Sequence, residues 1–246
     1  MKKHLLLFLF ILICSALHSQ DVVVTNNQVY IDSSAYQKKS DYARFRIAAA
    51  GGYSYRTIAL PPGTSGEVRD YYRKSYNGFL YGVEFNYYFN KFIGMGLNYY
   101  ASRFNPSGNN PDWYPDHISC KTRMQHVVPT VNFRVFDRQK QGALVAGVGI
   151  GYADYQTKFY QTNFHNVHVG TEKGWTVGML LSVGYDIPIS QMLAIYVQAA
   201  LHGGVVTNFT LIDETTGKTE TISVDDINDG VGLGKINLAI GLRFAK

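Results

Sequence analysis

The stretch INLAIGLRF (Ile236–Phe244) alternates between large apolar residues and small or polar residues without a break. Successive side chains of a β-strand point to opposite faces, so this stretch predicts a strand with one fully apolar face. The other face would carry Asn237, Ala239, Gly241 and Arg243. Such a pairing of faces is typical of a transmembrane β-barrel, in which the apolar face meets lipid.

Seven segments upstream show the same alternation. They are Tyr42–Arg56, Gly78–Phe89, Phe92–Arg103, Thr122–Phe136, Ala143–Tyr155, Trp175–Ile187 and Met192–His202. The connections alternate strictly between short ones, which are Asn90–Lys91, Asp137–Gly142 and Pro188–Gln191, and long ones, which are Thr57–Asn77, Phe104–Lys121, Gln156–Gly174 and Gly203–Lys235. Barrels place short turns and long loops at opposite rims. The sequence therefore predicts an all-β fold, an eight-stranded antiparallel transmembrane β-barrel with short periplasmic turns and long extracellular loops.

The N-terminal residues predict export from the cytoplasm. Two lysines precede the apolar run Leu5–Ile13, and small or polar residues follow it, which is typical of a signal peptide. We expect cleavage near Ser19 or Gln20. The predicted parts are a signal peptide at 1–20, a periplasmic lead-in at 21–41 and an outer-membrane β-barrel at 42–246.

Composition agrees with a membrane barrel. No segment after the signal peptide holds ~20 consecutive apolar residues, so no transmembrane helix is expected. Alternating residues cancel in the mean hydropathy, which is −0.11. The aromatic content of 14% suits the aromatic girdles of a barrel. Cleavage leaves Cys120 as the only cysteine, so we expect no intramolecular disulfide. Lys and Arg are scattered along the chain, which argues against nucleic-acid binding.

A soluble antiparallel sandwich or lipocalin-like barrel is the alternative, because its strands alternate in the same way. Such a fold turns its polar face to water, and that face normally carries many charged groups. Here the non-apolar positions hold mainly Gly, Ala, Ser and Asn, with almost no Lys. Small and amide side chains suit the narrow inside of a barrel, which favours the membrane arrangement.

The signal peptide, the alternating segments and the terminal pattern Asn237-x-Ala239-x-x-Leu242-x-Phe244 resemble a known family. It is the small outer membrane protein beta-barrel domain family, which includes the OmpX-like proteins and the transmembrane domain of OmpA. The resemblance covers Tyr42–Lys246 and implies a porin-family barrel surrounded by outer-membrane lipid in a Gram-negative cell. It also implies that Asn237, Leu242 and Phe244 are read by the barrel assembly machinery during insertion. Ala239 stands where Gly is usual.

Inward-facing charges form the candidate functional site. They are Arg44, Arg46, Glu84, Arg134, Asp186 and Arg243. The inside of an eight-stranded barrel is only wide enough for its own side chains, and buried charges need partners, so we expect a lumen charge network that plugs the barrel. Chain topology favours Arg46 first and Arg243 second as the partner of Glu84, because strand one pairs with both of its neighbours in a closed ring. The alternative is a gated path for ions or small solutes.

The sequence predicts no cofactor, no metal site and no catalytic group. The loop histidines His117, His165 and His168 fall short of the four ligands of a zinc site. The acidic run after Val224 fails the calcium-loop spacing. Lipid A deacylases of similar size carry a serine two residues after a histidine, whereas two glycines follow His202.

The long loops are the predicted working surface. Thr207–Ile212 and Thr219–Val224 alternate around Thr216–Gly217, which predicts a hairpin whose exposed edges could add a strand from an extracellular partner. Trp113 and Tyr114 lie at the aromatic tip of another loop. We therefore expect a structural or surface-interaction protein that is not an enzyme. The alternatives are a narrow porin-like channel for small solutes and a lipid-modifying outer-membrane enzyme.

Overall fold

The computed structural model describes residues 43–57, 73–109, 117–137, 142–163, 166–190, 192–226 and 230–245. The predicted signal peptide and lead-in lie outside these residues, as do Trp113, Tyr114 and His165. A single helical turn occurs at residues 73–76. In the described ranges no helix is long and apolar enough to cross a membrane.

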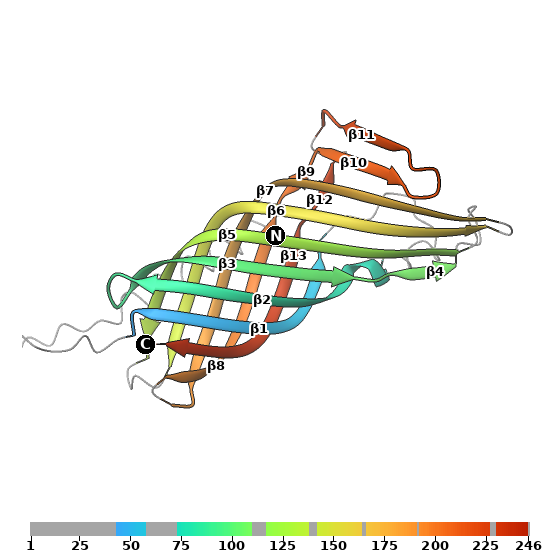
Figure 1. Ribbon diagram of the computed structural model, residues 1–246. Helices are drawn as coiled ribbons and strands as arrows, with labels where there is room; N and C mark the ends of the chain where they lie inside the picture. Colours follow the sequence, from blue (N-terminus) through green and yellow to red (C-terminus); the bar gives the residue numbers. More distant parts are fainter. Residues whose placement is uncertain are drawn as a thin grey trace, which may run out of the picture. The chain divides into compact units, whose positions relative to one another are not determined.

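Eight strands form a closed antiparallel ring (Figure 1). In chain order they are β1 (Phe45–Arg56), β2 (Asn77–Tyr88), β3 (Ile93–Phe104), β5 (His117–Phe136), β6 (Ala143–Asn163), β7 (Asn166–Pro188), β8 (Leu193–Gly203) and β13 (Lys235–Ala245). The ring closes because β1 pairs with both β2 and β13. Closure leaves the ring without a sheet edge, so the backbone hydrogen bonds are satisfied internally, as lipid requires. The predicted eight-stranded barrel is confirmed.

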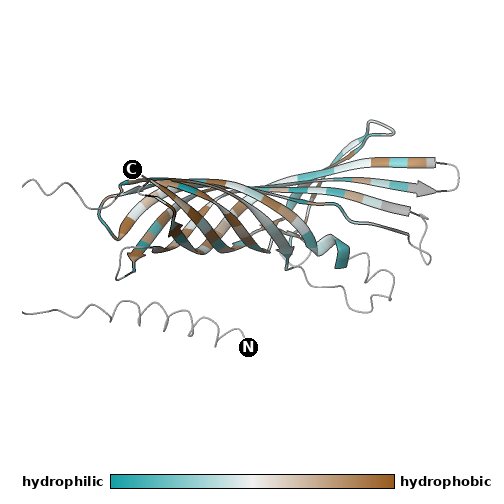
Figure 2. Ribbon diagram, turned by 90° about the horizontal axis from the view of Figure 1, so that it is seen from below, coloured by the Kyte–Doolittle hydropathy of each residue, from teal (hydrophilic) through white to brown (hydrophobic). Residues whose placement is uncertain are grey.

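The two faces of the wall differ in polarity, and the strands alternate between apolar and more polar residues along their length (Figure 2). On β13 every large apolar residue from Ile236 to Phe244 is exposed on the outside, Ile240 by 61%, whereas Asn237 and Ala239 on the inside are buried. Soluble proteins rarely expose continuous apolar surface of this extent. The outside therefore meets lipid, and the soluble alternative is excluded.

The apolar outside has the height of a membrane. On β5 the outward apolar run spans residues 127–135, and a tilted transmembrane strand needs roughly 9–11 residues. Within this apolar band, no outward residue of the described ring strands carries a charged side chain. The sequence therefore assigned the lipid-facing side of each strand correctly.

Two of the predicted long loops are wrong in part, because barrel strands continue through them. β5 begins at His117 rather than at Thr122, and β6 and β7 continue until only residues 164–165 separate them. These strand ends lie beyond the lipid, so neither face must be apolar and the period-two signal disappears from the sequence. The segment Gln156–Gly174 is consequently most of a long hairpin, not a loop.

This hairpin is the centre of a sheet above the membrane. β4 (Ser107–Asn109) pairs with β5, and β10 (Asn208–Asp213) pairs with β7 and with β11 (Thr219–Ser223). The predicted hairpin around Thr216–Gly217 is therefore confirmed. Gly217 has a φ of 73°, the left-handed conformation that glycine adopts most readily in a tight turn. A separate pair, β9 (Val205–Val206) and β12 (Val231–Gly232), precedes and follows the hairpin in the chain.

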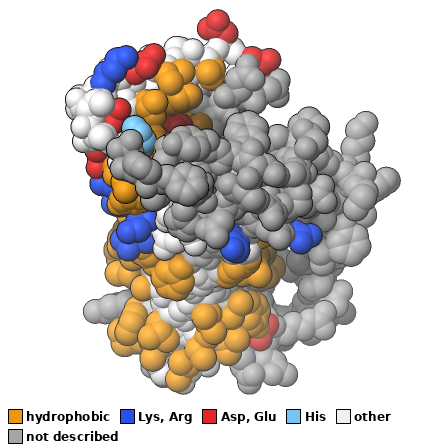
Figure 3. Space-filling view, turned by 90° about the vertical axis from the view of Figure 1, so that its right-hand side faces the viewer, with side chains coloured by type: hydrophobic (Ala, Val, Ile, Leu, Met, Phe, Trp, Pro, Cys, Tyr) orange, Lys and Arg blue, Asp and Glu red, His pale blue; other side chains and the backbone are white. Residues whose placement is uncertain are grey.

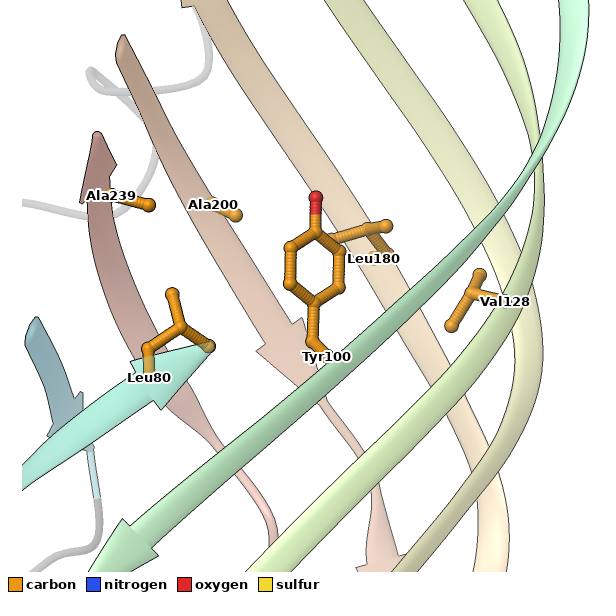
Figure 4. Packing of buried hydrophobic residues seen from close by; sticks show 6 residues of the cluster. All are labelled: Leu80, Tyr100, Val128, Leu180, Ala200 and Ala239. Carbon is orange, nitrogen blue, oxygen red and sulfur yellow. The ribbon is translucent and has the colours of Figure 1, made fainter. Parts of the chain in front are cut away.

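Side chains fill the inside of the ring. One buried cluster lies in the barrel and consists of Leu80, Tyr100, Val128, Leu180, Ala200 and Ala239 (Figure 4). A second lies nearer the extracellular end and consists of Phe104, Met124, Ala153, Tyr155, Val206 and Leu233. The lumen is thus a packed core with both polar and apolar layers.

Candidate functional site: the lumen charge network

Arg46 is the centre of the lumen charge network. It points inward from β1 and its side chain is 0% exposed. Its Nη1 donates to Glu84 Oε2 on β2 at 2.6 Å, and its Nη2 donates to Asp186 Oδ1 on β7 at 3.1 Å. The guanidinium also lies 4.3 Å from the ring centroid of Tyr196. Arg46 thus bridges two carboxylates from opposite parts of the ring, which offsets part of the cost of burying all three charges.

Glu84 binds a second set of partners through its other oxygen, Oε1. The hydroxyl of Tyr196 donates to this oxygen at 3.1 Å and the Nε2 of Gln198 at 2.6 Å. The hydroxyl of Tyr100 donates to it as well. The side chain of Glu84 is thus held by hydrogen bonds from three donors on β3 and β8 as well as by Arg46.

The remaining arginines occupy different environments. Arg243 Nε lies 3.3 Å from Asp186 Oδ2, so Asp186 pairs with two arginines. Arg134 is buried, donates to the carbonyl of Ala43 at 3.0 Å and lies 3.8 Å from the ring centroid of Tyr88. Sequence reasoning placed these residues inward, and the structure brings Arg46, Glu84, Asp186 and Arg243 into one connected set of contacts.

Arg44 is the exception among the predicted network residues. It precedes β1 and its side chain is exposed. Its carbonyl accepts from the amide of Tyr88 at 2.8 Å, so the backbone pairing continues past the end of the strand. The side chain lies at the rim, where water is reachable, and a lone arginine gains more from hydration than from burial. Arg44 therefore does not belong to the lumen network.

Tyrosines close the lumen around these charges by lying against glycines. Tyr100 is opposite Gly82 on the neighbouring strand, and a methyl group on Gly82 would overlap its ring. A methyl group on Gly184 would likewise overlap the ring of Tyr196 on the neighbouring strand. Both tyrosines are 1% exposed. The inward glycines therefore form the recesses that the tyrosine rings fill.

A polar layer that the sequence did not single out lies closer to the extracellular end. Lys235 is 1% exposed and its Nζ donates to Ser102 Oγ at 2.9 Å. The rings of His126 and His202 meet edge to face with centroids 4.7 Å apart. Neither histidine makes a hydrogen bond among the described residues. The sequence pattern placed Lys235 at the end of a long loop. In the structure Lys235 pairs directly with His202 on β8, so it is a residue of β13.

The terminal strand places its predicted assembly residues on both faces. Asn237 is buried and accepts a hydrogen bond from Ser54 Oγ at 2.6 Å. Leu242 and Phe244 are exposed on the lipid side. Their recognition by the assembly machinery remains a prediction.

The chemistry of the lumen is that of a structural core. In the described part of the chain no group of three or more His, Cys, Asp or Glu is arranged to hold a metal ion. His202 points into the packed lumen and is shielded from lipid by the barrel wall.

Comparison with known proteins agrees with this architecture. No family model and no curated protein sequence matches the chain. A major outer membrane protein from Thermus thermophilus has a similar structure, with a TM-score of 0.56 and 13% identity over 82% of this chain and 99% of that one. At this identity the likeness shows the fold alone. Together with the apolar outside of the closed ring, this shared fold supports a barrel that spans a membrane.

The chain is a small outer-membrane β-barrel. Two further structures resemble this barrel less. Neisserial surface protein A has a TM-score of 0.44 at 11% identity, covering 82% of this chain and 97% of that one. The outer membrane protease of Escherichia coli has a TM-score of 0.48 at 10% identity, covering 85% and 98%. Neither likeness bears on the activity of this barrel.

A charged contact also occurs in the extracellular sheet of this outer-membrane barrel. Lys158 Nζ on β6 lies 2.6 Å from Glu214 Oε2, in the turn between β10 and β11. Thr171 Oγ1 on β7 donates to the other oxygen of Glu214 at 2.7 Å. The hydrogen bonds from Lys158 and Thr171 hold the pKa of Glu214 below its ordinary value. This contact fastens the hairpin to the sheet.

Proposed function

We propose that the protein is a non-conducting outer-membrane barrel that presents its extracellular sheet to a binding partner. The observation that carries this proposal is the continuation of β5, β6 and β7 beyond the lipid, joined there by β4, β10 and β11. Ordered backbone hydrogen bonding so far above the membrane contributes nothing to spanning it. A rigid sheet is, however, a suitable platform for recognition.

The packed lumen supports the non-conducting part of the proposal. Arg46, Glu84 and Asp186 bind one another across the ring, and Tyr100 and Tyr196 lie against the wall beside them. A conducting path would require these contacts to separate, which would leave buried charges without partners. The narrow porin-like channel is therefore the weaker alternative.

The outer edge of β11 supports the recognition part. β11 pairs with β10 on one side, and no described strand pairs with its other side. A free edge offers unpaired backbone donors and acceptors to an extended segment of a partner. The strand is short and bears the exposed Glu220, which limits uncontrolled pairing with other sheets.

The experiment has two arms. Planar bilayers containing the purified barrel should show no stable single-channel conductance, whereas steady conductance would replace this proposal with the channel. In intact cells, a photo-crosslinking residue at Glu220 should capture a partner, and the same residue at Lys91 in a periplasmic turn should not capture that species. Absence of a Glu220-dependent product under all growth conditions tested would contradict the recognition role.

A lipid-modifying enzyme is the remaining alternative. It would need a nucleophile and a base accessible to lipid. Incubation of the pure barrel with outer-membrane lipids followed by mass spectrometry should show unchanged lipids, and a released acyl chain would overturn the non-enzymatic assignment.

A further inference from the structure

We propose that the barrel holds a small monovalent anion such as chloride in its lumen, between the ammonium of Lys235 and the imidazoles of His126 and His202. These three residues, called the basic layer, lie on β13, β5 and β8 and are each at most 5% exposed. The proposal concerns the inside of the barrel. It is independent of the extracellular sheet and of the charge network around Arg46.

The register of the strands brings the basic layer together. Lys235 is the direct cross-strand partner of His202, and directly opposed residues have Cβ atoms about 4.5–5.5 Å apart. The ring centroids of His126 and His202 lie 4.7 Å apart. The ammonium of Lys235 reaches across the lumen to Ser102 on β3, and His126 is paired with Tyr100 on that strand. The strands thus direct these polar groups towards one part of the lumen.

Lys235 is a buried cation without a counterion. Among the described residues it forms no ion pair. The inward carboxylate of Glu84 binds Arg46. That of Glu172 accepts a hydrogen bond from the hydroxyl of Tyr155. An unpaired buried charge is costly, so Lys235 gains from an anion that is supplied by the solution.

The basic layer is rich in hydrogen-bond donors without acceptors. An ammonium carries three donor hydrogens, and among the described residues only Ser102 Oγ accepts from Lys235. Both ring nitrogens of His126 and of His202 lack a partner, although each neutral imidazole carries one N–H donor. Asn237, two residues along the same face of β13, also has an unpartnered amide nitrogen. A single anion can accept several of these hydrogen bonds, whereas the ammonium would repel a metal cation.

The packing around the basic layer selects a small ion. The ring centroid of Tyr100 lies 5.1 Å from that of His202. On the side of β7, a methyl group added to Gly178 would come within 3.2 Å of the His126 ring. The space between these groups therefore favours a monatomic anion over a phosphate or an organic acid.

Apolar groups enclose the basic layer. Met124 belongs to the apolar cluster nearer the extracellular end and Val128 to the other, and each is two residues from His126 on the inward face of β5. Apolar side chains also cover the outside of the wall on the face that Figure 3 displays. In such a region the attraction between an ammonium and an anion is much stronger than in water. We therefore expect the anion to enter along the barrel axis.

Thermal unfolding in a non-ionic detergent tests the proposal, with the barrel refolded in sodium chloride or in sodium gluconate at the same ionic strength. Chloride at ten times its dissociation constant should raise the midpoint of the parent by about 3–6 °C. Lys235→Met should remove this dependence on chloride, because the variant has no cation to hold the ion. In gluconate the variant should unfold at a higher temperature than the parent, since an apolar group replaces an unpaired buried charge. The matched control is Lys218→Met, which removes the same charge from the exposed connection between β10 and β11 and should keep the chloride dependence.

A crystal structure of the parent grown from sodium bromide tests the position of the ion without any variant. The anomalous signal of bromide should give a peak between Lys235 Nζ and the rings of His126 and His202, and the absence of that peak would overturn the proposal. Equal midpoints in chloride and gluconate would overturn it as well, and a bromide peak found together with them would mark an adventitious ion only. A midpoint that rises with Zn²⁺ and not with chloride would assign the two histidines to a metal instead.

Discussion

Replacing Glu84 with glutamine should lower the unfolding free energy of the barrel by about 3 kcal/mol, near the lower end of the ~3–5 kcal/mol for breaking a buried ion pair. The loss arises because Arg46, which is completely buried, would keep only Asp186 as a carboxylate partner. In addition, the amide group of the new side chain would face donors that now bind the carboxylate. Because Arg46 would still contact Asp186, we expect the loss of unfolding free energy to stay near the lower end of this range.

Urea unfolding in lipid vesicles measures this change. Glu220→Gln is the matched control, because Glu220 is exposed on β11, and its unfolding free energy should change by less than about 0.5 kcal/mol. Arg46→Gln and the double variant complete a double-mutant cycle, in which contacting residues show a coupling of roughly 0.5–3 kcal/mol. Equal midpoints for Glu84→Gln and Glu220→Gln would refute the buried network and reopen the case for a wet, conducting lumen.

Three further changes probe other parts of the structure. Leu181→Arg should cost ~2–4 kcal/mol in the same unfolding assay, because its outward position lies in the middle of the apolar band; an unchanged midpoint would mean that this face does not meet lipid. Gly82→Val should cost about 1–3 kcal/mol, because the new side chain overlaps the Tyr100 ring, and unchanged stability would show that the recess is not filled. The contribution of Glu214 to the pairing of β10 with β7 should be fully present above pH 4.5, its ordinary pKa, and should be lost as the pH falls through its lowered pKa. Spin-label distances between β10 and β7 measure this loss, and Glu214→Gln should abolish its pH dependence because the group that binds Lys158 no longer titrates.

Much of the barrel could be predicted from the sequence because lipid imposes a strict rule on it. Every outward residue in the apolar band must be apolar, so the pattern of each membrane-spanning strand carries its own orientation. The prediction of strand ends failed above the lipid, where outward residues need not be apolar. Above the lipid, β5, β6 and β7 continue with polar residues on both faces, and only cross-strand hydrogen bonds show that they are strands.

The candidate site was predictable in its members but not in its contacts. Alternation placed Arg46, Glu84 and Asp186 inward, because polar residues inside a barrel avoid the lipid. It also placed Arg44 inward, although that residue lies at the rim and is exposed. The alternation shows on which face of the barrel wall a residue lies, but not its position along the barrel axis. That position decides whether a charged side chain is buried in the lumen or hydrated at the rim.

A period of two is a local property of the chain, so the sequence alone predicts the eight membrane strands, their lipid-facing sides and the inventory of lumen charges. The contacts among these charges depend on the closed fold. Arg46 and Asp186 are 140 residues apart in the chain, and they bind each other because the ring closes. The direct pairing of Lys235 with His202 likewise depends on strand register. Register and closure are set by all strands together, so no single segment of the sequence contains them.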